Sequence, residues 1–463
     1  MKLVYGVQDK PKFSQLIAFS FQQLLAIMAA TIAVPRIIGN GMSASAALFG
    51  AGVGTLVYLL FTKFKSPVFL GSSFAFINSM FVAFSGAVSM SVGYLGLIIG
   101  AAFAGLVYVV LAVIVKFAGV KWINKLMPAS VIGPTVAIIG LSLAGNAVGD
   151  LQSGSVLDKA GNSVASVYLC IICGLVTLLV TMLCSVYGKK MTKMIPFIIG
   201  IIAGYALAAF FTVIGIVDGN DAFKIIDFSK FSEMKWYPDF SFVQVFRTPL
   251  NFGKSGSLWS YITTIAVAYI PVAFVVFAEH IADHKNLSSI IEHDLLEDPG
   301  LHRTLLGDGV GSFAGAIFGG CPNTTYGESV GCVAISGNAS VVTIIGTAIM
   351  AIVISFIAPF STFLATIPSC VMGGVCISLY GFIAVSGLKM VQKVDLEDNR
   401  NLFTVAVILI SGIGGLQLTI GSVTITEVAC ALILGIITNT LLGGGKLLTD
   451  VEVKAPHRKK RKR

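Results

Sequence analysis

Long apolar stretches separated by short polar turns run through almost the whole chain. A transmembrane helix needs about 20 predominantly apolar residues in succession, and stretches near this length recur from the amino-terminal end to about residue 443. The pattern predicts an all-α polytopic membrane protein with fourteen transmembrane segments. They are expected at 14–36, 43–62, 68–86, 93–116, 127–146, 166–187, 195–216, 257–281, 303–320, 324–338, 340–358, 366–387, 402–421 and 427–443.

Composition supports a lipid environment. Of 463 residues, 56% are hydrophobic and only 11% are charged, whereas about 25% are charged in soluble proteins. Fifty glycines suit membrane helices, which pack closely through small residues. The eight cysteines lie mostly inside apolar stretches, so no disulfide framework is expected.

The distribution of positive charge predicts the orientation of the chain. With an even number of segments, both termini lie on one side, and 24 of the 31 Lys and Arg residues fall on that side. Because cytoplasmic loops collect Lys and Arg, we expect both termini of this multi-pass protein to face the cytoplasm across the cell membrane. We expect residues 217–256 to form an extracytoplasmic loop and the basic tail 444–463 to touch anionic lipid.

Two pairs of short sequences indicate an internal repeat. MPASVIGP near residue 128 and IPSCVMGG 240 positions later share a proline, a valine and a glycine, and GSSFAF at 71–76 is matched by NTTYGE at 323–328. Each half contains seven predicted segments, an odd number, so the second copy must enter the membrane inverted. Inverted repeats are typical of secondary transporters, which bind substrate near the midplane where segments break in both halves.

The hydroxyl-rich members of these pairs predict the breaks. Ser72-Ser73-Phe74 and Thr324-Thr325-Tyr326 have neighbouring glycines, and Pro322 precedes the second, which disfavours a continuous helix. Irregular backbone at membrane depth is tolerated where it lines a cavity or is buried in protein. Its free N–H and C=O groups would contact a ligand, and Phe74 and Tyr326 would offer flat aromatic faces.

Acidic residues converge on the same region. Glu279 and Asp283 are four positions apart in an apolar helix and therefore share one face. Each carboxylate would cost roughly 2.5 to 3.5 kcal/mol in hydrocarbon, so the face is expected to line a polar cavity together with Glu328. Carboxylates, exposed backbone and aromatic rings suit a small planar heterocycle with alternating N–H and C=O groups, and uracil has such an edge.

Four segments resemble a known family. AEHIADH at 278–284, DLLEDPGLHR at 294–303, PNTTYGESVG at 322–331 and LGSSFAFI at 70–77 are similar to the nucleobase-ascorbate transporter (nucleobase:cation symporter-2) family, most closely to its bacterial uracil permeases. The resemblance implies two inverted sets of seven segments, short antiparallel β-strands in segments 3 and 10, and proton symport. It also implies a homodimer formed largely by gate domains.

The resemblance further implies two domains, each built from both halves of the chain. Residues 1–126 and 257–358 would form the core domain. Residues 127–216 and 359–443 would form the gate domain.

Site residues follow by position in the matching motifs. Glu279 and Glu328 would form hydrogen bonds with the nucleobase. Phe74 and Gly327 would offer backbone N–H groups, and Tyr326 would line the pocket. Ala30 and Tyr380 would close around it. Asp283, together with Glu279, would carry the coupled proton, because two acids one turn apart in a low-dielectric cavity titrate as a pair.

Two departures from the family's motifs leave the identity of the substrate open. Asp283 stands where a well-known uracil permease has histidine, as in purine-transporting relatives. Glu328 favours the uracil branch over the xanthine and urate branch, but Ser329 replaces the usual asparagine. A xanthine or urate permease is therefore the alternative, followed by a channel with the same fold.

Other functions lack the residues they need. A membrane enzyme would require a nucleophile or a metal set, and none is assembled. His280 and His284 lie near Asp283, but no further ligand at suitable spacing completes a zinc site, so no metal, cofactor or nucleic-acid partner is expected. Asp308 and Glu427 lie near segment ends and are expected to be solvated or adjacent to the pore.

Overall fold

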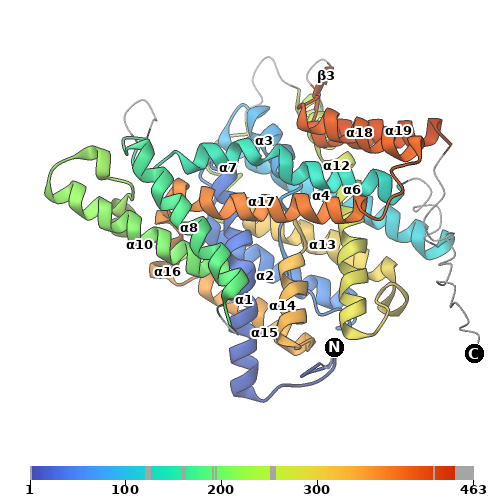
Figure 1. Ribbon diagram of the computed structural model, residues 1–463, viewed down its shortest axis with the longest axis horizontal. Coiled ribbons are helices and arrows are strands. Elements are labelled where there is room, and N and C mark those ends of the chain that lie inside the picture. The colour runs from blue at the N-terminus through green and yellow to red at the C-terminus, as the bar shows by residue number, and fades with distance from the viewer. Residues whose placement is uncertain are drawn as a thin grey trace, which may run out of the picture.

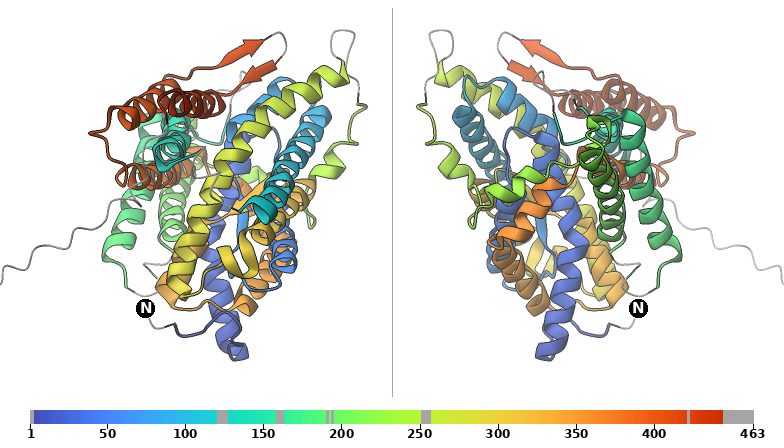
Figure 2. Two further views of the ribbon diagram at one scale, coloured as in Figure 1. Left: turned by 90° about the vertical axis from the view of Figure 1, so that its right-hand side faces the viewer. Right: turned by 90° about the vertical axis from the view of Figure 1, so that its left-hand side faces the viewer.

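The computed structural model describes residues 3–119, 127–157, 163–189, 192, 195–250, 257–420 and 423–443. Helices dominate these residues and form two groups that lie side by side (Figures 1 and 2). One group contains elements from the beginning and the middle of the chain, and the other contains most of the remainder. Each group therefore joins segments that are distant in sequence.

We call the first the α2–α13 group. Its members are α1 (Phe13–Ile38), α2 (Ala44–Phe61), β1 (Leu70–Ser72), α3 (Ile77–Ser85), α4 (Met90–Ala118), α12 (Leu258–Ile291), η3 (Leu296–Gly300), α13 (Leu301–Gly319), β2 (Asn323–Thr325), α14 (Gly327–Ser336) and α15 (Val341–Ser355). Helix α13 packs along α2 and α4. Glycine allows this approach, because a Cβ atom on Gly54 would lie 2.6 Å from the carbonyl oxygen of Gly311.

We call the second the α6–α17 group. It comprises α6 (Ala129–Ser142), α7 (Ala144–Leu151), α8 (Val167–Tyr187), α10 (Pro196–Val217), α17 (Ser369–Val391), α18 (Asn399–Ile413), the hairpin of β3 (Leu418–Ile420) and β4 (Val423–Ile425), and α19 (Glu427–Leu441). Helix α17 packs on α6, α7 and α8. The connecting elements η1 (Asp221–Phe223), η2 (Phe228–Glu233), α11 (Ser241–Gln244) and α16 (Ala358–Thr366) lie beside the two groups, and η2 contacts α16.

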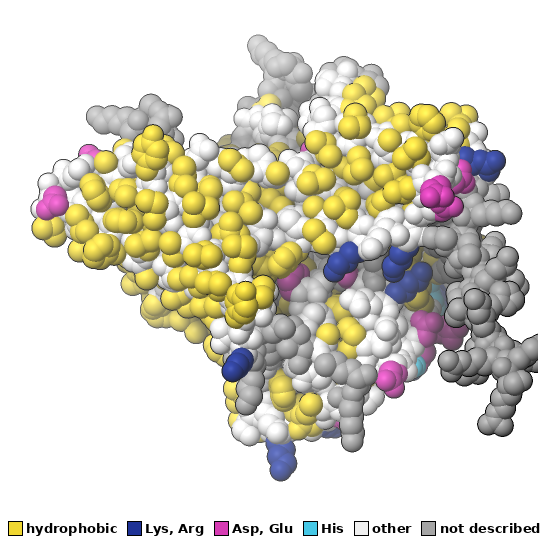
Figure 3. All heavy atoms as spheres, viewed as in Figure 1, with side chains coloured by type: hydrophobic (Ala, Val, Ile, Leu, Met, Phe, Trp, Pro, Cys, Tyr) yellow, Lys and Arg dark blue, Asp and Glu magenta, His cyan; other side chains and the backbone are white. Residues whose placement is uncertain are grey.

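Eight helices in the described residues are long and apolar enough to cross a membrane: α1, α2, α4, the α6–α7 pair, α8, α10, α12 and α17. Helices α15 and α16 together make a ninth candidate, bent by 83°. Apolar side chains cover the surface over α8 and α10 in Figure 3. Tyr168 of α8 and Phe210 of α10 are among the exposed apolar residues. The molecule is thus a multi-pass membrane protein, while the count of fourteen segments stays a prediction.

Two of the predicted segments contain a strand followed by a short helix. Strand β1 pairs antiparallel with β2, with Leu70 opposite Thr325 and Ser72 opposite Asn323. Tyr326 then folds over the first strand, and its hydroxyl donates to the carbonyl oxygen of Ser72 at 2.9 Å. Its ring lies where a side chain on Gly71 would project. This small sheet fixes the starts of α3 and α14.

Candidate functional site

A cavity of about 320 Å³ lies between the two helix groups. One wall comes from α1, α12 and α14, and the facing wall comes from α6, α10 and α17. The polar groups lie on the first wall, whereas the second is mainly apolar. The lining residues are Ala26, Glu279, Asp283, Gly327, Glu328, Gly331 and Cys332 on the first wall, and Val136, Pro196, Phe197, Leu379, Phe382, Ile383, Ser386 and Met390 on the second.

Helix α12 places Glu279 and Asp283 one turn apart on the face that lines this cavity. The hydroxyl of Thr325, at the end of β2, donates to Oδ2 of Asp283 at 2.9 Å. The backbone of Gly327 is also close, because a Cβ atom placed there would lie 3.9 Å from Oδ1 of Asp283. Asp283 is therefore held by the second break rather than by its own helix.

Glu328 occupies the first turn of α14, directly after the break. The first backbone N–H groups of a helix have no partner within it, and this end of α14 faces the cavity through Gly327 and Glu328. The next residue, buried Ser329, accepts hydrogen bonds from Nε2 of Gln23 at 2.6 Å and from the backbone N–H of Phe69 at 3.0 Å. These bonds fix the rotation of α14 and so the direction of Glu328.

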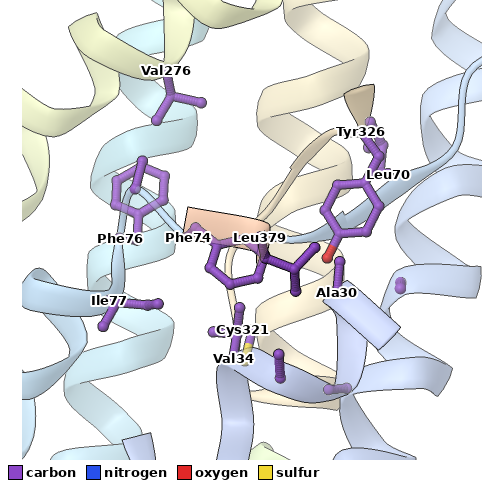
Figure 4. Close-up of a cluster of buried hydrophobic side chains, with 14 of the residues drawn as sticks. Ala30, Val34, Leu70, Phe74, Phe76, Ile77, Val276, Cys321, Tyr326 and Leu379 are labelled. Carbon is purple, nitrogen blue, oxygen red and sulfur yellow. The ribbon is translucent and has the colours of Figure 1, made fainter. Parts of the chain in front are cut away.

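The structure thus brings Glu279, Asp283, Gly327 and Glu328 together around one cavity. The other four predicted residues lie beside it. Ala30, Phe74, Tyr326 and Tyr380 belong to the buried apolar core, and Figure 4 shows the first three in one cluster with Leu379, a residue that also lines the cavity. The rings of Phe74 and Tyr380 meet edge to face across the two helix groups, with centroids 5.9 Å apart.

A buried polar network lies behind the cavity wall. His280 contacts Oδ2 of Asp308 at 2.7 Å through Nδ1 and Oγ1 of Thr304 at 2.9 Å through Nε2. His284 contacts the hydroxyl of Tyr58 at 2.7 Å. Of the two alternatives for Asp308, solvation is wrong, since α13 buries it completely against α12. Its partner His280 directly follows cavity-lining Glu279 in the chain. Within the described part of the chain, no cluster of three His, Cys, Asp or Glu residues could hold a metal.

Sequence reasoning missed two kinds of site residue. The first is Thr325, which the sequence marked only as part of a break. Strand alternation places its side chain on the same face of β2 as that of Asn323, and Leu70 is its partner on β1. The second kind is the apolar wall, including Phe197, Phe382 and Ile383. Apolar residues on a membrane helix carry no signal that separates a cavity wall from a lipid-facing surface.

The arrangement favours binding and passage over chemistry. Carboxyl groups and a helix start can hydrogen-bond a small polar molecule, while the facing wall, apart from Ser386, contributes shape. A polar cavity between two groups of apolar helices defines the class of the protein, a multi-pass membrane transporter.

Comparison with known proteins gives the family. The xanthine and uracil model described as "Permease family" matches residues 14–421. The "Uracil permease" of Bacillus caldolyticus is 39% identical over 450 residues, which cover 96% of this chain and 95% of the relative. The "Uracil permease" of Escherichia coli K12 is 36% identical over 433 residues, with 93% and 92% covered.

The fold is similar to that of solved transporters. The transmembrane domain of a cyanobacterium bicarbonate transporter, BicA, superposes with a TM-score of 0.63 at 16% identity, covering 94% of this chain and 100% of that one. The chain belongs to the permease family matched above, the nucleobase-ascorbate transporter (nucleobase:cation symporter-2) family that the motifs indicated. It is a transporter and not an enzyme.

Proposed function

We propose that the protein imports uracil together with protons across the cell membrane by alternating access. The observation that carries this proposal is the convergence of Glu279, Asp283, Gly327 and Glu328 on one cavity between the two helix groups. The volume of about 320 Å³ falls at the lower end of the range for small-molecule sites. A single small ring suits such a space.

The assignment of uracil as the substrate rests on the hydrogen-bonding groups of the cavity and on the proteins that the chain is similar to. Carboxylates accept hydrogen bonds from N–H groups, and the start of α14 offers backbone N–H groups to carbonyl oxygens. Uracil presents both groups along one edge. Relatives that cover nearly the whole chain are uracil permeases, which supports uracil over xanthine or urate.

The proposal of proton coupling rests on the charges of the substrate and of the cavity. Uracil is neutral, so the membrane voltage alone cannot concentrate it. Three carboxyl groups that face one cavity repel one another when ionised, and binding a proton relieves that repulsion. Asp283 is the proposed carrier together with Glu279, because it touches both the break at Thr325 and the cavity.

The architecture proposed for this cycle has fourteen segments in two inverted sets. The α2–α13 group corresponds to the core domain and the α6–α17 group to the gate domain, through which two copies would form a homodimer. On α17, the residues that line the cavity lie between Leu379 and Met390, near the carboxyl end of the helix. Lys393 and Arg400 follow this end in the sequence. Because positive charge marks the cytoplasmic side, we infer that the cavity lies towards the cytoplasm.

Uptake of labelled uracil into right-side-out vesicles tests the proposal. We expect accumulation above the external concentration, collapse on addition of a protonophore, and competition by unlabelled uracil but not by xanthine or urate. Passive equilibration would indicate a channel instead. Competition by xanthine or urate alone would assign the protein to the purine branch.

Substitution of Asp283 separates binding from coupling. Asp283→Asn is expected to bind uracil but to lose concentrative uptake, while Glu279→Gln and Glu328→Gln lose binding. Glu297→Gln is the matched control, because that exposed glutamate lies in η3 and does not line the cavity. Full accumulation by Asp283→Asn would remove Asp283 from the mechanism.

A further inference from the structure

Two polar contacts lie at one end of the interface between the helix groups. We call this the loop end, because η2 and its neighbours lie there beside α16. The first contact is made by Arg36, in the last turn of α1. Its Nη1 donates to the carbonyl oxygen of Ala365 at 2.8 Å, and its Nη2 donates to that of Ile367.

The sequence explains why these carbonyl groups are available. Helix α16 ends at Thr366, and Pro368 precedes α17. The last carbonyl groups of a helix have no intrahelical partner, and a proline cannot extend the helix through that point. Arg36 therefore caps the end of α16, the element that connects α15 of its own group to α17 of the other group. Lys230 of η2 donates to the same Ala365 oxygen at 3.0 Å, and Asp150 lines the adjoining cavity with both cations.

The second contact involves Glu427, the first residue of α19. Its carboxylate accepts one hydrogen bond from Nε2 of Gln417 at 2.9 Å, within the same group, and one from Nδ2 of Asn78 on α3, in the other group. Glu427 is 7% exposed, so the alternative that it is solvated is wrong. Its partners Asn78 and Gln417 line an adjoining cavity.

Neither contact lines the central cavity. On α1, Arg36 lies ten residues beyond cavity-lining Ala26, which is about 15 Å along the helix. On α17, Ser369 and Met372 line a separate cavity of about 390 Å³ beside Arg36, whereas Leu379 to Met390 line the central one. Asn78 shares its own cavity with Thr264 of α12, which is 15 residues, or about 22 Å, before Glu279.

We propose that Arg36 with Ala365 and Ile367, and Asn78 with Glu427, form two clasps that close the loop end of the transport pathway. This inference rests on the proposed alternating access, since only a cycle that opens this end needs to break them. A movement that separates the two groups at the loop end must break the bond between Asn78 and Glu427, and it must pull the connection between α16 and α17 away from Arg36. The clasps therefore hold the conformation whose cavity opens at the other end.

The chain offers a matched control for each clasp. Gln417→Ala removes a bond to the Glu427 carboxylate within one group, whereas Asn78→Ala removes the bond between groups. Lys230→Ala removes a cation of η2 from the Ala365 oxygen, whereas Arg36→Ala removes the donor that ties α1 to the connection between α16 and α17. Both variants of each pair lose a polar contact, but only Asn78→Ala and Arg36→Ala break a clasp.

The test measures access to two serines of α17 changed to cysteine. Ser369→Cys reports on the cavity at the loop end, and Ser386→Cys reports on the central cavity. A membrane-impermeant thiol reagent is applied to right-side-out and inside-out vesicles without substrate, with the unmodified chain as background. We expect Arg36→Ala and Asn78→Ala to raise labelling at Ser369→Cys by about tenfold, since a bond to a charged group contributes this much to an equilibrium. Labelling at Ser386→Cys should fall.

The controls Gln417→Ala and Lys230→Ala should change either rate by less than about twofold. Equal labelling of clasp and control variants would overturn the proposal. If Arg36→Ala does not fold, Arg36→Lys tests the same contact with a single-point donor, and the Asn78 arm stands independently. Because no substrate is added, a failure here is distinct from a failure of uracil uptake by the unmodified protein.

Discussion

Gly71 is the position where the smallest change should disturb the site most. An alanine Cβ there would lie 2.2 Å from Cζ, 2.3 Å from Cε2 and 2.7 Å from the hydroxyl oxygen of Tyr326. Carbon atoms prefer separations of about 3.5 to 4.0 Å, so the ring would have to move by more than about 1 Å. Tyr326 is 4% exposed and hydrogen-bonded to Ser72, which leaves it little room.

Two costs add in Gly71→Ala. Overpacking of a tight core costs about 1 to 3 kcal/mol, and loss of the Tyr326 hydrogen bond costs about 0.5 to 1.5 kcal/mol. We therefore expect a destabilisation of about 2 to 4 kcal/mol, together with a strong loss of substrate binding, because displaced Tyr326 carries Gly327 and Glu328 with it. Thermal unfolding in detergent and equilibrium binding of labelled uracil measure the two effects.

Gly145→Ala is the control, since a Cβ atom on Gly145 meets nothing within 4 Å and should change stability by no more than about 0.5 kcal/mol. Replacing the ring as well, in Gly71→Ala/Tyr326→Leu, should recover part of the stability lost in the single variant. Wild-type stability of Gly71→Ala, or a double variant whose losses simply add, would refute the packing argument.

Two further predictions concern single hydrogen bonds. Thr325→Val keeps the shape of the side chain but removes the 2.9 Å hydrogen bond to Asp283. We expect weaker proton coupling, measured as a lower accumulation ratio of uracil, whereas Thr324→Val should leave that ratio unchanged. Equal effects of the two substitutions would contradict the role of Thr325. In the loops, Lys65 lies 2.7 Å from Asp298 and, chiefly through this hydrogen bond, holds the pKa of that aspartate below its usual value. A depressed folded-state pKa stabilises the fold above the unfolded pKa of about 3.9 and loses this contribution as the pH falls through the folded pKa. Lys65→Met should therefore lower the thermal midpoint near pH 7 but not near pH 2, and a pH-independent difference would exclude this pair as its cause.

The acidic half of the site was predictable from spacing and cost. Glu279 and Asp283 share a helical face in an apolar segment, and a carboxylate in lipid is expensive, so a cavity had to lie there. The break at Thr325 was predictable because glycine, proline and hydroxyl residues cluster around it. The hydrogen bond between Thr325 and Asp283 was not, because it joins elements whose relative position depends on the packing of α12 and α13.

Residues at segment ends were harder to place. The positions of Asp308 and Glu427 near segment boundaries predict that they are solvated or adjacent to the pore, because charged residues there usually reach water. Burial of Asp308 depends on His280, which lies 28 positions away, and burial of Glu427 depends on Asn78, which lies 349 positions away. Local patterns do not contain such partners. The apolar cavity wall at Phe197 and Ile383 was equally hidden, since its composition matches that of a lipid-facing helix.

The pairing of β1 with β2 has a consequence for biosynthesis. Leu70 and Thr325 lie opposite one another, so the first strand leaves the ribosome long before its partner exists. At about 5 to 20 residues per second, the interval is on the order of 10 to 50 s. During that time the polar backbone of the first strand must be sheltered by the insertion machinery or by water, which makes completion of the second half the step that seals the binding site.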